Sequence, residues 1–120
     1  MKIHIEEIDH AIEIDYRGTL NFNYSFGAAY VYSLEAENDL LNFGDVLWLS
    51  EIDEILADCR KTGITEFTIS SSFSSLIEAI AEFQKRGCMM QGLVEINSRY
   101  EKDWNTGERK RIPAFLMKIC

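Results

Sequence analysis

The sequence predicts an α+β domain in which about three helices pack on a mixed, largely antiparallel sheet. Period-two stretches near both ends indicate half-buried strands, because side chains alternate between the two faces of a sheet. Two helix-like stretches flank a short apolar strand in the middle of the chain. A turn signal, Asn105-Thr106-Gly107, joins the last two strands into a long C-terminal hairpin. The expected order is β(β)-α-α-β-α-β-β.

In the first half, residues 2–8 and 11–16 alternate apolar and polar side chains, which predicts two strands or one bent strand. Residues 26–42 have helical spacing, and Gly44 would end this helix in a left-handed cap. A second helix is predicted over residues 50–63. Ser50 would accept a hydrogen bond at its start, and the helix would stop at Gly63.

In the second half, residues 64–70 form a strand that runs directly into a helix ending at Gly87. Residues 88–96 and 112–119 are the two strands of the hairpin. The last strand carries apolar residues on both sides, which predicts coverage on both faces. Pro113, however, favours a sheet edge or a strand start, since proline donates no backbone hydrogen bond.

The totals indicate one globular domain over residues 1–120, with 47% hydrophobic residues. No apolar run approaches the roughly 20 residues that cross a bilayer, and the acidic, alternating N-terminus does not have the pattern of a signal peptide. We therefore expect a cytoplasmic protein without membrane contact. The cysteines Cys59, Cys88 and Cys120 are odd in number and widely spaced, which argues against a disulfide framework or a zinc site.

A serine-rich stretch joins the central strand to the following helix. A helix N-terminus can bind anions through its unpaired N–H groups, but the glycine patterns of the common phosphate loops do not occur. Serines are also good helix caps, and Ser75 with Glu78 has capping-box spacing. We favour a cap and keep an anion-binding loop as the alternative. The candidate residues are Ser70, Ser71, Ser72, Ser74 and Ser75.

The hairpin connection, residues 99–111, holds five basic and three acidic residues in a chain of net charge −8. The remaining residues therefore carry −10, a balance that makes nucleic acid an unexpected partner. Trp104 is a large aromatic residue among charges at the predicted tip. Its ring either folds back on its own strands or contacts a partner, another protein or a second copy. The candidate interaction surface consists of Arg99, Trp104, Arg109 and Arg111.

No metal or cofactor is expected. His4 and Glu6 would share a strand face, but acidic residues on exposed strands are common without a metal. Residues 103–108, "DWNTGE", depart from the calcium-loop pattern in the position of the glycine and in the closing glutamate, so a turn is the better interpretation. Nothing in the sequence assembles a nucleophile, a base and an oxyanion site, so no catalytic residue is assigned.

Four segments carry a resemblance: "GITEFTISSSFSSLIE", "FQKRGCMMQGL", "DWNTGE" and "IPAFLMKI". Through them, the stretch from Phe43 to Ile119 resembles a family of small uncharacterised bacterial α/β proteins, seen in gut Firmicutes and often near mobile elements. This resemblance implies a bacterial cytoplasmic protein and no particular activity. In layout, "AIAEFQKRGC" and the hairpin after it are similar to the C-terminal half of GNAT acetyltransferases, although the loop that holds acetyl-CoA in those enzymes is missing here.

We therefore expect a small accessory or protein-interaction domain without catalytic activity. One alternative is a GNAT-like or other domain that binds an anionic small molecule at the serine-rich stretch. The other is an acidic inhibitor that mimics nucleic acid, which would require the acidic residues to form one continuous face.

Overall fold

The computed structural model describes residues 23–44, 47–70 and 75–119. The two N-terminal stretches predicted as strands lie outside these residues. The elements, in chain order, are helix α2 (Tyr24–Glu35), strand β1 (Asn42–Phe43), the 3-10 turn η1 (Leu49–Glu51), helix α3 (Ile52–Lys61), strand β2 (Glu66–Ser70), helix α4 (Leu76–Lys85), strand β3 (Met89–Lys102) and strand β4 (Arg109–Lys118).

The four strands form one sheet in the order β1-β2-β4-β3. β1 runs parallel to β2, and the other two pairings are antiparallel. The predicted α+β class, the mixed sheet and the C-terminal hairpin are therefore confirmed. Among the described residues, β4 lies between β2 and β3, and β3 is an outer strand of the sheet.

The main core lies on the face of the sheet that carries Phe67 and its partner on β4, Met117. The Phe67 ring packs against Phe83 of α4 at 4.7 Å and against Phe43 of β1 at 5.5 Å between ring centroids. α3 adds its buried apolar stripe to the same cluster. Burying such aromatic surface is the largest stabilising contribution available to a domain of this size.

The second half of α2 packs on the opposite face. Ala114 of β4 is three residues from Met117, so its side chain points to the other side of the sheet. Tyr32 and Ala36 of α2 form a second buried cluster with Ala114 and with Ile96 of β3. Helices therefore cover both faces of the sheet.

α2 begins and ends earlier than predicted. Asn23 caps it, because its Oδ1 accepts from the backbone N–H of Ser25 at 2.8 Å and of Phe26 at 3.3 Å. The helix stops before Glu37, whose φ of 60° is incompatible with a right-handed helix. Residues near 42 instead form β1, so the prediction that Gly44 caps this helix was wrong.

Gly44 is required for close packing. A Cβ atom there would lie 2.8 Å from both the Ser70 hydroxyl and the Tyr32 ring.

The predicted cap of the second helix was also wrong. Ser50 lies within η1, and the residue in the N-cap position of α3 is Glu51, which makes no capping hydrogen bond through its side chain. The stop at Gly63 is confirmed, since α3 ends at Lys61 and Gly63 has a φ of 77°.

Pro113 fits its place in β4. Among the described residues, the last pair between β4 and β2 joins Ala114 to Ser70, and Pro113 is paired on one side only, with Glu95 of β3. Within these residues, β4 is an inner strand up to Ala114 and an edge at Pro113. The missing N–H of proline is tolerated there.

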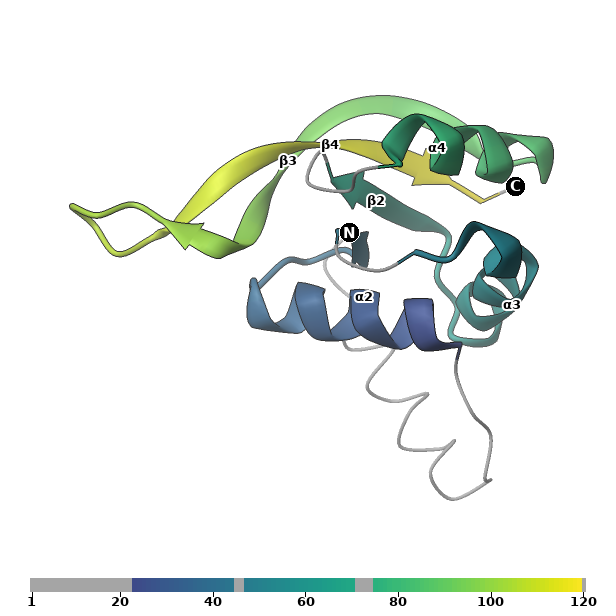
Figure 1. Cartoon of the computed structure of the whole chain (residues 1–120), viewed down its shortest axis with the longest axis horizontal. Coiled ribbons are helices and arrows are strands. Elements are labelled where there is room, and N and C mark those ends of the chain that lie inside the picture. Colours follow the sequence, from purple (N-terminus) through teal and green to yellow (C-terminus); the bar gives the residue numbers. More distant parts are fainter. Residues whose placement is uncertain (1–22, 45–46, 71–74, 120) are drawn as a thin grey trace, which may run out of the picture.

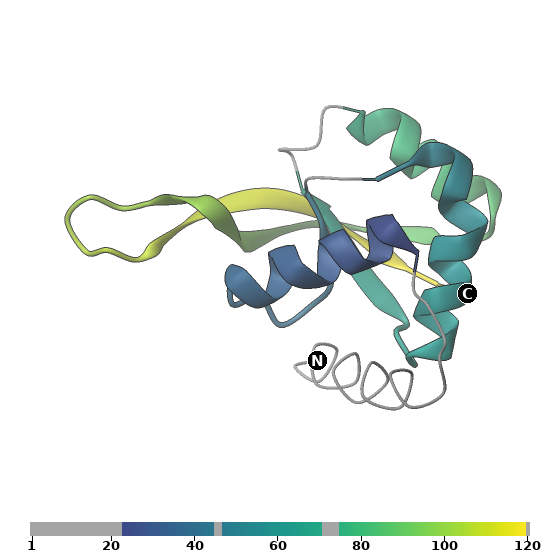
Figure 2. The same cartoon turned by 60° about the horizontal axis from the view of Figure 1, so that its bottom comes forward.

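The β3–β4 hairpin extends well beyond the rest of the molecule (Figure 1). Its inner part belongs to the sheet, between the helices, whereas its outer part projects away from them in both views (Figure 2). The register between the two strands is interrupted between Asn97 and Lys102, where the outer part begins. We call residues 98–111 the arm and the remaining described residues the body.

Candidate functional site

The arm ends in a tight turn that its own residues stabilise. Asp103 Oδ1 accepts hydrogen bonds from the backbone N–H of Asn105 at 2.7 Å and of Thr106 at 3.3 Å. The backbone N–H of Gly107, whose φ is 72°, donates to the Asp103 carbonyl at 2.9 Å. The Asp103 carboxylate therefore organises a turn, as the sequence predicted in preference to a calcium loop.

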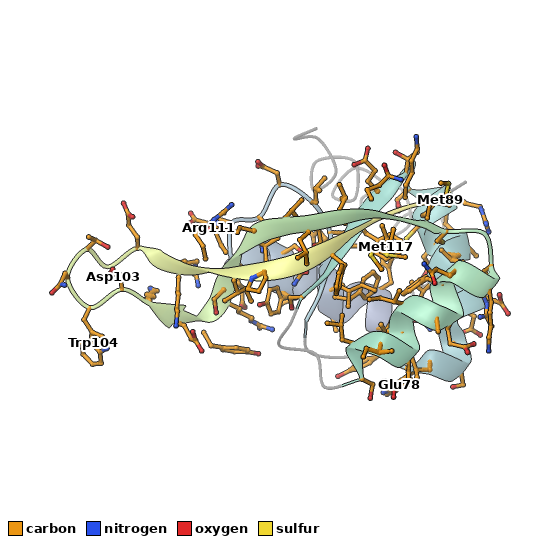
Figure 3. All side chains as sticks on the ribbon, turned by 90° about the horizontal axis from the view of Figure 1, so that it is seen from above. Glu78, Met89, Asp103, Trp104, Arg111 and Met117 are labelled. Carbon is orange, nitrogen blue, oxygen red and sulfur yellow. The ribbon has the colours of Figure 1, made fainter. Side chains whose placement is uncertain are left out.

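Trp104 lies in this turn, and its side chain is 99% exposed. Figure 3 shows it at the end of the arm, far from Met89 and Met117 at the other end of the hairpin. The ring thus does not lie on its own strands. An open hollow of about 660 Å³ borders it, lined by Tyr100, Glu101, Lys102, Asp103, Trp104, Gly107 and Lys110.

Arg99 fixes the base of the arm to α2. Its Nε donates to Glu35 Oε2 at 2.6 Å. Its guanidinium carbon lies 5.3 Å from the centre of the Tyr100 ring and 6.0 Å from that of Tyr32. The two rings meet edge to face at 6.4 Å. Each contact is modest, but together they join the arm to a helix of the body.

Arg109 and Arg111 fasten β3 and β4 to each other, Arg109 within the arm and Arg111 at its base. Arg109 Nη1 donates to the backbone carbonyl of Arg99 at 2.8 Å. Arg111 donates to Asn97 Oδ1 at 2.9 Å and to the Glu95 carbonyl at 2.8 Å. The three arginines of the candidate surface are thus engaged within the chain, and none of them lines the hollow beside Trp104.

Counted along the sequence, the arm is net positive, whereas in the folded chain nearby carboxylates balance this charge. Arg99 and Arg111 lie at its base, where Arg99 pairs with Glu35 and Arg111 Nε lies 3.9 Å from Glu95 Oε2. Both carboxylates come from outside residues 99–111. Between Tyr100 and Lys110, three basic and three acidic side chains balance. The tip is therefore neutral and aromatic, with its positive charges compensated nearby.

Tyr100 and Lys110 border the hollow and were not assigned by the sequence. Tyr100 is 70% exposed, and Lys110 pairs with Glu101 at 3.4 Å. Trp104 lies in the turn, two residues beyond the end of β3, so strand alternation could not place its ring relative to that of Tyr100.

A larger groove, of about 680 Å³, runs between α2 and the arm. Glu35 and Glu37 line one wall, and Arg109 and Arg111 line the other. Opposite charges facing each other across a groove select no ligand of either sign. Trp104 is therefore the better candidate for a contact residue.

The serine-rich stretch is described only at its ends. Ser70 is the last residue of β2 and is fully buried. Ser75 occupies the N-cap position of α4, but its side chain makes no capping hydrogen bond, so the predicted Ser75–Glu78 capping box was wrong. Ser71, Ser72 and Ser74 lie outside the described residues. The strand-to-helix connection is confirmed, and a bound anion stays a prediction.

The described part of the chain offers few other groups that could bind a metal or act as a nucleophile. No three His, Cys, Asp or Glu side chains among these residues gather as metal ligands would. Burial, with a smaller contribution from the Asp58 charge, raises the pKa of the Cys59 thiol, so Cys59 is not a nucleophile at neutral pH. Within the same residues, no helix has the length and apolar character of a membrane span.

A family profile described as a domain of unknown function, DUF7698, matches residues 25–119. The match begins in α2, before the stretch whose resemblance the sequence suggested, and includes the whole arm. No curated protein and no solved structure matches the chain.

Proposed function

The chain belongs to the DUF7698 family, and we propose that it is a non-catalytic protein-interaction domain whose arm presents Trp104 to a partner protein. The observation that carries this proposal is the 99% exposure of Trp104 at the end of the arm. A tryptophan side chain in water contributes nothing to folding through burial, whereas the same ring placed in a partner's recess is a typical binding hot spot.

The bracing of the arm supports this role. Ordering a flexible segment on binding costs free energy, about 0.5–1.5 kcal/mol for each immobilised side chain of many rotamers. The Asp103 turn and the Arg99 contacts with α2 hold the arm in place before any partner arrives. Binding therefore needs little further ordering of the arm.

The charge of the tip indicates the kind of partner. With three basic and three acidic side chains from Tyr100 to Lys110, the tip has no net charge to attract an acidic or a basic surface. The recess that accepts Trp104 is therefore apolar, rimmed by groups that tolerate Tyr100 and Lys110. Affinity should change less than about threefold between roughly 50 and 300 mM salt, because few net charges are screened.

The test uses a photoreactive aromatic amino acid in place of Trp104 in cells of the source organism. The matched control carries it at Ile77, an apolar residue of α4 that is 79% exposed. We expect a protein crosslinked from position 104 and not from position 77. In purified form that protein should bind the Trp104→Ala variant at least about tenfold more weakly than the wild type. Equal binding of both forms would refute the proposal.

A further inference from the structure

The outer edge of β3 offers a second interaction surface, away from the tip of the arm. Among the described residues, β3 has a paired strand, β4, on one side only. An edge strand presents backbone N–H and C=O groups that can pair with a strand of another chain.

The hydrogen bonds of Asn97 show which residues point outward. Its backbone N–H donates to Asn38 Oδ1 at 2.8 Å, and its carbonyl accepts from Asn38 Nδ2 at 3.1 Å, so both groups face away from β4. The direction of the backbone N–H and C=O groups alternates from one residue to the next along a strand. These groups of Glu95 and Leu93 therefore also face outward. The Glu95 carbonyl accepts a hydrogen bond from the Arg111 side chain.

A bulge lies between Met90 and Gly92, where the register with β4 skips Gln91. Gly92 has a φ of 133°, which a residue with a Cβ atom rarely adopts. Beyond the bulge the alternation resumes, and Met90 is the next residue whose backbone faces outward.

The two ends of this edge differ in whether their outward-facing backbone groups are hydrogen-bonded. At Asn97 and Glu95, side chains of Asn38 and Arg111 already occupy the outward positions. Around Met90 and Leu93, no hydrogen bond from the described residues closes the edge. There the side chains of Met89, Met90 and Leu93 are 54%, 39% and 68% exposed. An open edge beside exposed apolar side chains is characteristic of an association site.

We infer that the β3 edges of two copies of this chain pair antiparallel, with Met90 of one copy opposite Leu93 of the other. In this register, outward-facing residues meet outward-facing residues on both strands. Directly opposed residues lie on the same face, so Met90 contacts Leu93 twice, once on each side of a two-fold axis. The edge is therefore complementary to itself.

The absence of charge along this edge is compatible with a second copy as the occupant. Two chains of net charge −8 repel each other unless they meet through an uncharged surface. Residues 88–94 contain no charged side chain, and the proposed register places Glu95 opposite Cys88 and not opposite another carboxylate. The pairing is short, so the dimer should be weak and should form at high protein concentration.

Sedimentation velocity of the full chain, from about 10 µM to about 1 mM, tests the inference. The wild type should shift towards dimer, and Leu93→Asp, which places a carboxylate opposite Met90 of the other copy, should weaken association by at least about tenfold. Ile77→Asp, at an exposed site on α4, and Trp104→Ala, at the tip of the arm, are controls that should dimerise as the wild type does.

A wild type that stays monomeric over this range would overturn the inference. Association lost in Trp104→Ala but kept in Leu93→Asp would also overturn it and would place the contact on the arm. Hydrogen exchange on the wild type needs no substitution: the Leu93 N–H should exchange more slowly as concentration rises. An unchanged rate in a sample that sediments as a dimer would exclude pairing through this edge.

Discussion

The body and the arm share two strands but are held together by different interactions. In the body, β3 and β4 belong to a sheet on which helices pack, and buried apolar residues such as Phe67 of β2 and Met117 of β4 exclude water. In the arm, the same strands are joined by arginine hydrogen bonds and by a carboxylate-capped turn, with Trp104 in solvent. Stability is thus concentrated in the body, and the arm is free to serve another purpose.

The largest effect should come from the aromatic core of the body. Phe67→Ala removes a ring that packs on both Phe43 and Phe83. We expect a loss of about 3–5 kcal/mol in the free energy of unfolding, because the cavity cannot close completely. Urea denaturation measures it, and a loss under about 1 kcal/mol would show that the core is looser than described.

The next effect concerns the loop that covers the edge of β3. Asn38→Ala leaves the N–H and the carbonyl of Asn97 without their side-chain partner. We expect a loss of about 1–3 kcal/mol on urea denaturation. The variant should also self-associate more strongly than the wild type, because the unpaired edge becomes longer. Unchanged stability would mean that water replaces Asn38 without cost.

The Cys59 thiol gives the body a pH dependence. Burial raises the pKa of this thiol above its value in the unfolded chain, so its contribution to stability is complete below the unfolded pKa. As pH rises beyond that value, the unfolded thiol ionises, and stability falls by roughly 1.4 kcal/mol for each pH unit. Cys59→Ala should lack this part of the decline between about pH 8 and pH 10; identical slopes in the two proteins would contradict the assignment.

A smaller effect is expected where the arm meets α2. Arg99→Ala removes the Glu35 ion pair and the contacts with Tyr32 and Tyr100, for a loss of about 1 kcal/mol. Its main consequence should be local: amides of the arm should exchange faster while those of β2 do not. Lys110→Ala, which removes an exposed ion pair within the arm, is the matched control. Equal exchange in both variants would argue against Arg99 as the brace.

Local patterns explain what the sequence predicted correctly. The hairpin, α3 and the passage from β2 to α4 follow from alternation, helical spacing and turn residues, all of which act over a few positions. The early end of α2 and the two-residue β1 depend instead on contacts distant in sequence, such as Asn38 with Asn97, 59 residues apart. Local propensity carries no information on such contacts.

The candidate site shows the same division. The sequence placed Trp104 at the tip because a turn signal surrounds it. It also grouped Arg99, Arg109 and Arg111 with Trp104, since charge counted along a segment ignores partners elsewhere. In the folded chain, Glu35 and the backbone carbonyls of Glu95 and Arg99 engage these guanidinium groups. The arginines therefore stabilise the fold, and the neutral tip with Trp104 remains the candidate contact surface.

The most direct test of this division between a stabilising body and an interacting arm is the unfolding free energy of Trp104→Ala. Because the ring is 99% exposed, the variant should match the wild type within about 0.5 kcal/mol on urea denaturation. Its affinity for the crosslinked partner should nevertheless fall at least about tenfold. A loss of several kcal/mol in stability, on the scale of a truncated core aromatic, would contradict the account, since it would place Trp104 in the folded core.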